Sequence, residues 1–146
     1  MIKIPTRVLI VDDEKDFVDM LSLRLEAAGE TVHSAGSGEQ ALARLAEAPI
    51  DVVLLDIQMP GLDGIEVLRE IRRRHPLVEV ILLTGHGTVA TAVAAMKLGA
   101  YDYLEKPADF KDLSLKLEGA RKRREAHEER VRKAEAKLLL CKSGNI

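Results

Sequence analysis

The chain has 146 residues, a length that suits one domain with a single sizeable core. Its 47% hydrophobic and 32% charged residues are typical of a globular protein and argue against disorder. With two Phe, two Tyr and no Trp, it is poor in the aromatic residues that stack on single-stranded nucleic acid. The lone Cys141 cannot build a disulfide framework and fits a reducing compartment, so we expect a cytoplasmic location.

The net charge of −2 is unevenly distributed along the chain. Residues 111–146 hold 11 Lys/Arg against 6 Asp/Glu, whereas residues 1–110 hold 11 against 18. The acidic body could attract a metal ion and the basic tail acidic partners, although such asymmetry is also typical of a solvated helix face. The longest uncharged run, residues 80–96, is interrupted by TGHGT, so we do not expect it to span a membrane.

Short apolar runs alternate with segments of helical periodicity along the chain. The runs predict strands at residues 8–11, 31–35, 51–55, 79–84 and 100–104. Helices are predicted at residues 17–28, from 37, at 65–75, at 88–99 and from about 109. The first helix should bury a face made of Phe17, Met20, Leu21, Leu25 and Ala28, and Ser37 with Gln40 forms a capping-box pattern at the start of the second. This alternation predicts an α/β fold of five βα units around a parallel sheet, with the apolar run DVVLL as a central strand.

Chemically reactive side chains follow four of the five predicted strands. They are Asp12 and Asp13 after the first, Asp56 after the third, Thr84 after the fourth and Lys106 after the fifth. Each also has an ordinary explanation: Asp13 could cap a helix, and Asp56 could be a turn residue. Thr84 could be a β-branched strand residue and Lys106 a surface lysine. Ligands of open α/β sheets bind at the carboxyl ends of the strands, so we expect these side chains to meet at one edge.

The adjacent carboxylates of Asp12 and Asp13 repel each other unless a cation offsets their charge. Together with Asp56 they could hold one Mg²⁺, which takes carboxylates, phosphate oxygens and water as ligands. A carboxylate beside such an ion can act as a nucleophile and form an aspartyl phosphate. Lys106 and Thr84 would then stabilise the charge on the phosphoryl oxygens. The set predicts phosphoryl transfer to a carboxylate.

Four segments, VLIVDDE, DVVLLDIQMPGLDG, ILLTGHG and YDYLEKP, resemble the receiver domain of bacterial two-component response regulators, from residue 7 to about residue 120. The stretch TGHGTVATAVAAMKLGAYDYLEKP is most similar to receivers of nitrogen-regulator-type transcriptional activators. The resemblance implies a flavodoxin-like (βα)5 doubly wound parallel sheet with strand order 2-1-3-4-5. It places the receiver domain at residues 1–120, and a charged helical extension follows at residues 121–146.

The resemblance also implies roles for the acidic residues. Asp56 would accept the phosphoryl group from a sensor histidine kinase. Asp13, Asp56 and the backbone carbonyl of Gln58 would ligate Mg²⁺, or alternatively Mn²⁺, while Asp12 would act mainly through water. Gln58 and His86 lie beside the path of an attacking water at positions that vary within the family, so the phosphate lifetime stays open.

In the same resemblance Lys106 pairs with the phosphoryl group, and the Lys106–Pro107 peptide bond is cis. Thr84 would move toward the new phosphoryl oxygens, and Tyr103 would turn inward into the space that Thr84 leaves. This switch would be read on the surface formed by the fourth helix, the fifth strand and the fifth helix, which could also form a homodimer. The alternative for Tyr103, less favoured than the switch role, is an ordinary half-buried aromatic residue on an edge strand.

The tail has a 4,3 spacing of mostly apolar positions, interrupted by two polar ones: Leu113, Leu117, Ala120, Arg124, His127, Val131, Ala134 and Leu138. It is compatible with a marginal coiled coil that forms a dimer, or with a solvated linker helix. The basic run RKRR at residues 121–124 could contact phosphates, but it carries no recognised motif, so a dimerising or linker helix is favoured over direct binding of nucleic acid.

These residues bear on three function classes. A phosphoacceptor switch that is no enzyme beyond its own phosphorylation and dephosphorylation fits all of them. A haloacid-dehalogenase-like phosphatase needs an acid two residues after the nucleophile, where this chain has Gln58. A pseudo-receiver that is not phosphorylated and acts as a dimerisation or scaffold module remains the alternative. The sequence specifies neither the kinase, nor the signal, nor the output.

Overall fold

The computed structural model describes residues 4–58, 64–85 and 89–142. Within them a parallel sheet has the strand order β2-β1-β3-β4-β5. Its strands are β1 (Arg7–Val11), β2 (Thr31–Ala35), β3 (Val52–Asp56), β4 (Glu79–Thr84) and β5 (Asp102–Glu105). This order is the one expected from the sequence, so the flavodoxin-like fold is confirmed.

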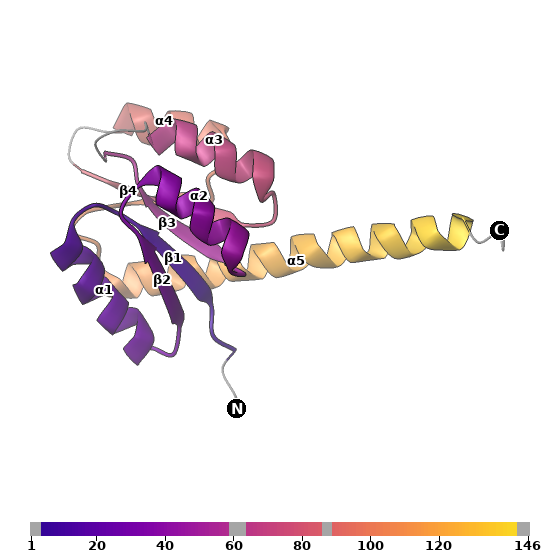
Figure 1. The fold of residues 1–146 in the computed structure, drawn as a ribbon, viewed down its shortest axis with the longest axis horizontal. Helices are drawn as coiled ribbons and strands as arrows, with labels where there is room; N and C mark the ends of the chain where they lie inside the picture. Colours follow the sequence, from indigo (N-terminus) through magenta and orange to yellow (C-terminus); the bar gives the residue numbers. More distant parts are fainter. Residues whose placement is uncertain (1–3, 59–63, 86–88, 143–146) are drawn as a thin grey trace.

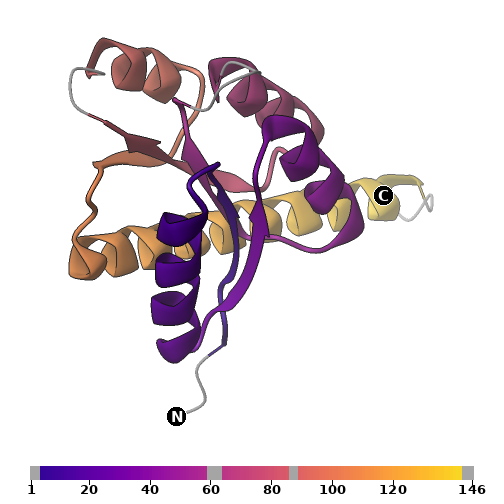
Figure 2. The same ribbon diagram turned by 60° about the vertical axis from the view of Figure 1, so that its left-hand side comes forward.

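Helices cover both faces of the sheet (Figures 1 and 2). They are α1 (Lys15–Ala27), α2 (Gly38–Glu47), α3 (Gly64–Arg74), α4 (Val89–Lys97) and α5 (Phe110–Lys142). One core joins α2, α3 and α4 to one face of the strands, and a second core joins α1 and α5 to the other. Neighbouring residues of a strand therefore enter opposite cores, as Leu54 and Leu55 of β3 do.

The central strands are buried on both faces. Every residue of β3 and β4 is buried, as the apolar run DVVLL predicts for a central strand. The edge strands β2 and β5 bury only Ala35 and Leu104. The third strand begins one residue later than predicted and the fifth two residues later. Pairing with β4 starts only at Val52 in β3 and at Asp102 in β5.

The buried face of α1 overlaps the predicted one, because Leu21 and Leu25 are buried and Phe17 packs against the core. It also includes Val18, however, and it leaves Met20, at 46% exposure, and Ala28 exposed. The sequence of this helix carries two overlapping apolar stripes, and the sheet selects the one that begins at Val18. The predicted cap of α2 is present in part: the Gln40 amide donates to the Ser37 hydroxyl, but the Gln40 side chain accepts from Gly36.

Helix α5 begins against the sheet and continues well beyond it (Figure 1). Its first apolar positions, Leu113, Leu117 and Ala120, are buried in the core with α1. They are therefore not part of an intermolecular seam, whereas Val131 and Leu138 further along are exposed. No helix in the described ranges is long and apolar enough to cross a membrane.

Candidate functional site

The predicted site residues meet at the carboxyl edge of the sheet. Strands β1 and β3 pair with Val11 opposite Leu55, so the next residues of the two segments, Asp12 directly after β1 and Asp56 at the end of β3, become neighbours. One carboxylate oxygen from each of Asp12, Asp13 and Asp56 lies within 4.8 Å of the others. The convergence expected from the strand ends is therefore present.

Backbone amides orient two of these carboxylates. The amide of Glu14 donates to Asp12 Oδ1 at 2.9 Å, and the amide of Gln58 donates to Asp56 Oδ1 at 2.9 Å. Asp12 and Asp56 are buried, at 2% and 5% exposure, while Asp13 is exposed. Each buried carboxylate thus keeps its other oxygen, Oδ2, for a cation.

Lys106 supplies a positive charge to this cluster. Its Nζ lies 2.6 Å from Asp12 Oδ2 and 3.3 Å from Asp56 Oδ2, with Glu14 Oε1 at 3.6 Å. The ammonium also lies 4.5 Å from the centre of the Phe17 ring. The Lys106 amide donates to the Thr84 carbonyl at 2.8 Å, which holds the start of this segment against the end of β4. The Lys106–Pro107 peptide bond is cis.

Burial and neighbouring charges shift the pKa values of Asp56 and Lys106. Burial, aided by the nearby charge of Asp12, raises the pKa of the Asp56 carboxyl above its usual value, although the Gln58 amide and Lys106 oppose the shift. Burial lowers the pKa of Lys106, but the hydrogen bonds and charges of Asp12 and Asp56 outweigh it, so the net shift is upward. The acidic cluster therefore holds more negative charge than one lysine offsets.

The donor set fits a hard divalent cation. Three carboxylates from two loops converge, two of them anchored by backbone amides, and an ammonium already lies among them. Mg²⁺ prefers oxygen ligands and commonly uses one or two carboxylates together with water and phosphate oxygens. Asp12, Asp13 and Asp56 could therefore hold such an ion, with room left for other ligands.

The two expected switch residues lie on adjacent strands. Thr84 is 2% exposed, and its hydroxyl donates to the Leu104 carbonyl at 3.3 Å. Tyr103 is 39% exposed and lies outward, near Lys116, whose Nζ donates to the Tyr103 carbonyl at 3.0 Å. In this structure Thr84 thus points along the sheet toward β5.

Sequence reasoning missed three neighbours of the cluster, namely Glu14, Phe17 and Gly85. Glu14 and Phe17 contact Lys106, and their positions in the loop after the first strand and in the first turn of α1 were the available signal. A Cβ at Gly85 would lie 2.5 Å from Gln58 Oε1, so glycine allows the Gln58 side chain to lie against the end of β4. His86 lies outside the described residues.

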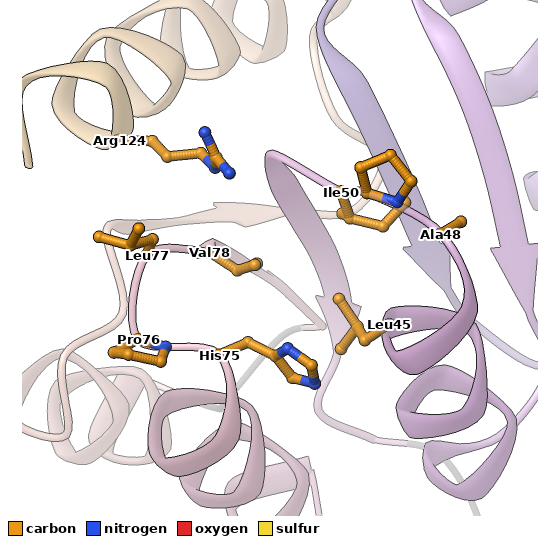
Figure 3. A pocket seen from close by; sticks show the side chains of 9 residues that line it. Leu45, Ala48, Ile50, His75, Pro76, Leu77, Val78 and Arg124 are labelled. Atoms are coloured by element: carbon orange, nitrogen blue, oxygen red, sulfur yellow. The ribbon is translucent and has the colours of Figure 1, made fainter. Parts of the chain in front are cut away.

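Of two pockets in the described part of the chain, one adjoins the acidic cluster and the other does not. The first is lined by Asp12, Asp13 and the end of β2 at residues 34–36, among others. The other, shown in Figure 3, lies at the opposite ends of the strands, between residues 48–50, residues 75–78 and Arg124 of α5. The second pocket shares no residue with the candidate site.

A parallel sheet in this order, with carboxylates and a lysine at its carboxyl edge, defines a receiver-type α/β protein. Residues 8–118 match the family model of the response regulator receiver domain. The chain therefore belongs to the response regulator receiver family.

Relatives support this assignment. The chain is 45% identical over 115 residues to an NtrX-like response regulator of Rickettsia bellii, covering 77% of this chain and 24% of that protein. A response regulator receiver domain protein from Clostridium thermocellum superposes with a TM-score of 0.79 at 39% identity, covering 83% of this chain and 98% of that one. NtrX from Brucella abortus superposes with a TM-score of 0.82 at 36% identity, over 86% and 29% of the two chains. The chain thus spans about a quarter of the length of the curated relatives it matches.

Proposed function

We propose that this receiver domain is a phosphoacceptor switch in which Asp56 takes up a phosphoryl group. The observation that carries the proposal is the joint placement of Asp56, Asp12 and Asp13 within 4.8 Å, with Lys106 Nζ 3.3 Å from Asp56 Oδ2. Membership of the receiver family supports the same reading.

The reaction would be an in-line displacement at phosphorus. A carboxylate oxygen of Asp56 forms a bond to the phosphorus, and the bond between phosphorus and the donor breaks, with its electron pair leaving on the donor. With acetyl phosphate the leaving group is acetate, and with a phosphohistidine it is the imidazole. Asp56 must be ionised to attack; burial raises the pKa of its carboxyl, while the Gln58 amide and Lys106 oppose that shift.

The surrounding residues would orient the group and stabilise charge. Lys106 can move its ammonium from the carboxylates to a phosphoryl oxygen, because Nζ already lies next to Asp56. Asp12, Asp13, Asp56 and the backbone carbonyl of Gln58 would hold Mg²⁺, or alternatively Mn²⁺. The ion would neutralise charge between the carboxylates and the phosphoryl oxygens.

The output would be a change at Thr84 and Tyr103. A phosphoryl group on Asp56 offers the Thr84 hydroxyl a charged acceptor in place of the Leu104 carbonyl. If Thr84 turns away from β5, the exposed Tyr103 can turn inward. The surface of α4, β5 and α5 would then change, and this surface already exposes Val93, Met96 and Tyr103.

The phosphodonor is proposed to be a sensor histidine kinase in the cytoplasm, because this is what receivers pair with. Residues 1–120 would form the phosphoacceptor domain, and residues 121–146 would connect it to an output or to a second copy. The output itself is not specified by these residues.

Trapping of the acyl phosphate tests which residue is modified. After incubation with acetyl phosphate and Mg²⁺, reduction with borohydride converts a phosphorylated aspartate to homoserine. Peptide mapping should find homoserine at position 56. Homoserine at position 12 or 13 instead, with position 56 unchanged, would contradict the assignment of Asp56.

A further inference from the structure

Two carboxylates are buried at the end of the sheet opposite the candidate site. Asp51 directly precedes β3 and is 6% exposed, and Glu79 opens β4 and is 2% exposed. They are neighbours, because the Glu79 amide donates to the Asp51 carbonyl at 3.1 Å. The proposed phosphoryl chemistry uses neither of them.

Each carboxylate has one arginine partner within the body of the domain. Arg7 binds Asp51 with two side-chain hydrogen bonds, at 2.8 Å and 3.1 Å. Arg72 of α3 lies 3.6 Å from Glu79 Oε1 and donates to the Val78 carbonyl at 2.7 Å. The body alone therefore supplies one positive charge for each buried negative charge.

A second arginine for each carboxylate comes from α5. Arg123 Nε lies 2.5 Å from Glu79 Oε2, and Arg124 Nε lies 3.4 Å from Asp51 Oδ1. The Arg123 guanidinium also lies over the Tyr101 ring, 5.5 Å from its centre. Figure 3 shows Arg124 reaching from α5 toward the segment before β3. The basic run of the sequence is thus turned toward the domain itself in these two residues.

These contacts come where the apolar packing of α5 ends. Ala120 is the last residue of α5 in the buried core, and from there the helix continues away from the sheet (Figure 1). One residue before Ala120, Gly119 lets the Tyr101 hydroxyl approach the helix where a Cβ would collide with it. Glycine weakens a helix at this point, so the direction of the following residues depends on contacts made beyond it.

We propose that Asp51 and Glu79, with Arg123 and Arg124, form a two-point ionic latch that fixes the direction in which α5 leaves the receiver domain. Consecutive helix residues point about 100° apart, so one pair resists rotation of the helix that the other would allow. The same two strands carry Asp56 and Thr84 at their other ends. The latch thus connects the strands of the candidate site to the projecting helix.

The latch can be tested with the natural thiol as a probe site. Cys141 is exposed near the end of α5, about 26 Å along the helix from Arg124 at 1.5 Å per residue. A second label site is supplied by Ala46→Cys on the exposed face of α2. Spin labels on both, in full-length chain diluted with unlabelled chain, give a distribution of intramolecular distances by double electron–electron resonance.

The latch variant is Arg123→Gln with Arg124→Gln, which leaves Arg72 and Arg7 to pair with the buried carboxylates. The control is Arg130→Gln with Arg132→Gln, which removes the same charge from exposed positions of α5. Parent and control should give one narrow distribution, and the latch variant one at least twice as wide. Each single latch variant should give an intermediate width, which keeps the test open if the double variant unfolds.

Amide hydrogen exchange gives a second readout. Protection at residues 121–130 should fall at least tenfold in the latch variant and stay within twofold in the control. Equal distance widths in parent and latch variant would overturn the proposal. Equal broadening in latch variant and control would overturn it too, because the effect would then follow helix charge rather than the two ion pairs.

Discussion

Replacement of Lys106 by methionine removes the positive charge from the acidic cluster while keeping much of the side-chain volume. Lys106 Nζ lies 2.6 Å from Asp12 and 3.3 Å from Asp56, and its side chain is only 17% exposed. Without a divalent ion, Lys106→Met should cost about 2 to 4 kcal/mol of unfolding free energy, because two buried carboxylates then face each other unpaired. At about 3 °C per kcal/mol, the melting temperature should fall by about 6 to 12 °C.

Magnesium should reverse much of this loss. A unit positive charge about 5 Å from a divalent ion repels it by about 1.7 kcal/mol even at the dielectric constant of water. Removal of that charge, and of the competing ion pairs, should therefore tighten Mg²⁺ binding at least about tenfold. The variant should gain more stability than the parent at any given Mg²⁺ concentration, because a ligand at free concentration c that binds only the folded state stabilises it by RT ln(1 + c/Kd), which grows as Kd falls.

The assay is thermal unfolding in EDTA and across a Mg²⁺ series, with Lys97→Met as the control for loss of a positive charge at an exposed position of α4. The control should match the parent both in melting temperature in EDTA and in the stability gained with Mg²⁺. If Lys106→Met binds Mg²⁺ as weakly as the parent or more weakly, Lys106 does not compete with a cation at this cluster and the reasoning is wrong.

Three further substitutions test the packing and the buried charges. Gly64→Ala would place a Cβ 2.6 Å from the Ile57 Cα, so it should lower the free energy of unfolding by about 1 to 3 kcal/mol in urea titrations; a change below about 0.5 kcal/mol would contradict this contact. Asp56→Asn should raise stability in EDTA at neutral pH by about 0.5 to 2 kcal/mol, since the raised pKa of Asp56 means that its ionised form opposes folding. That gain should shrink as the pH falls through the raised pKa, and a gain that does not depend on pH would refute the explanation. Asp51→Asn should lower the free energy of unfolding by about 1 to 3 kcal/mol. Burial raises the pKa of the Asp51 carboxyl, but the hydrogen bonds and the charge of Arg7 outweigh burial, so the net pKa lies below its usual value. The advantage of the parent should be complete above about pH 4 and disappear as the pH falls through the lowered pKa; an advantage that persists in strong acid would exclude ionised Asp51 as its source.

Most of the fold and the site follow from local features of the sequence. Strand length, apolar runs and the rule that ligands bind at carboxyl ends were enough to bring Asp12, Asp13, Asp56 and Lys106 together. These features are local because each of these residues lies at the end of a strand or within two residues after it.

Other contacts could not be predicted, because they join residues distant in sequence. The apolar residues of α1 form two overlapping stripes, and only the sheet decides that Val18 rather than Met20 is buried. Arg123 pairs with Glu79, and Arg124 pairs with Asp51, across long separations in the sequence. A polar residue at the first position of an otherwise apolar strand was the one available signal. This signal indicates that the carboxylate needs a positively charged partner, but it does not indicate which residue that partner is.

The central claim is that Asp56 accepts a phosphoryl group, and intact mass spectrometry tests it most directly. The parent and Asp56→Asn are incubated side by side with acetyl phosphate and Mg²⁺, and Mg²⁺ binding is checked in both by thermal unfolding. The account predicts the mass of one added phosphoryl group in the parent, none in the variant, and none in the parent with EDTA. No added mass in the parent with Mg²⁺ bound would contradict the account and favour a receiver that acts as a scaffold without phosphorylation.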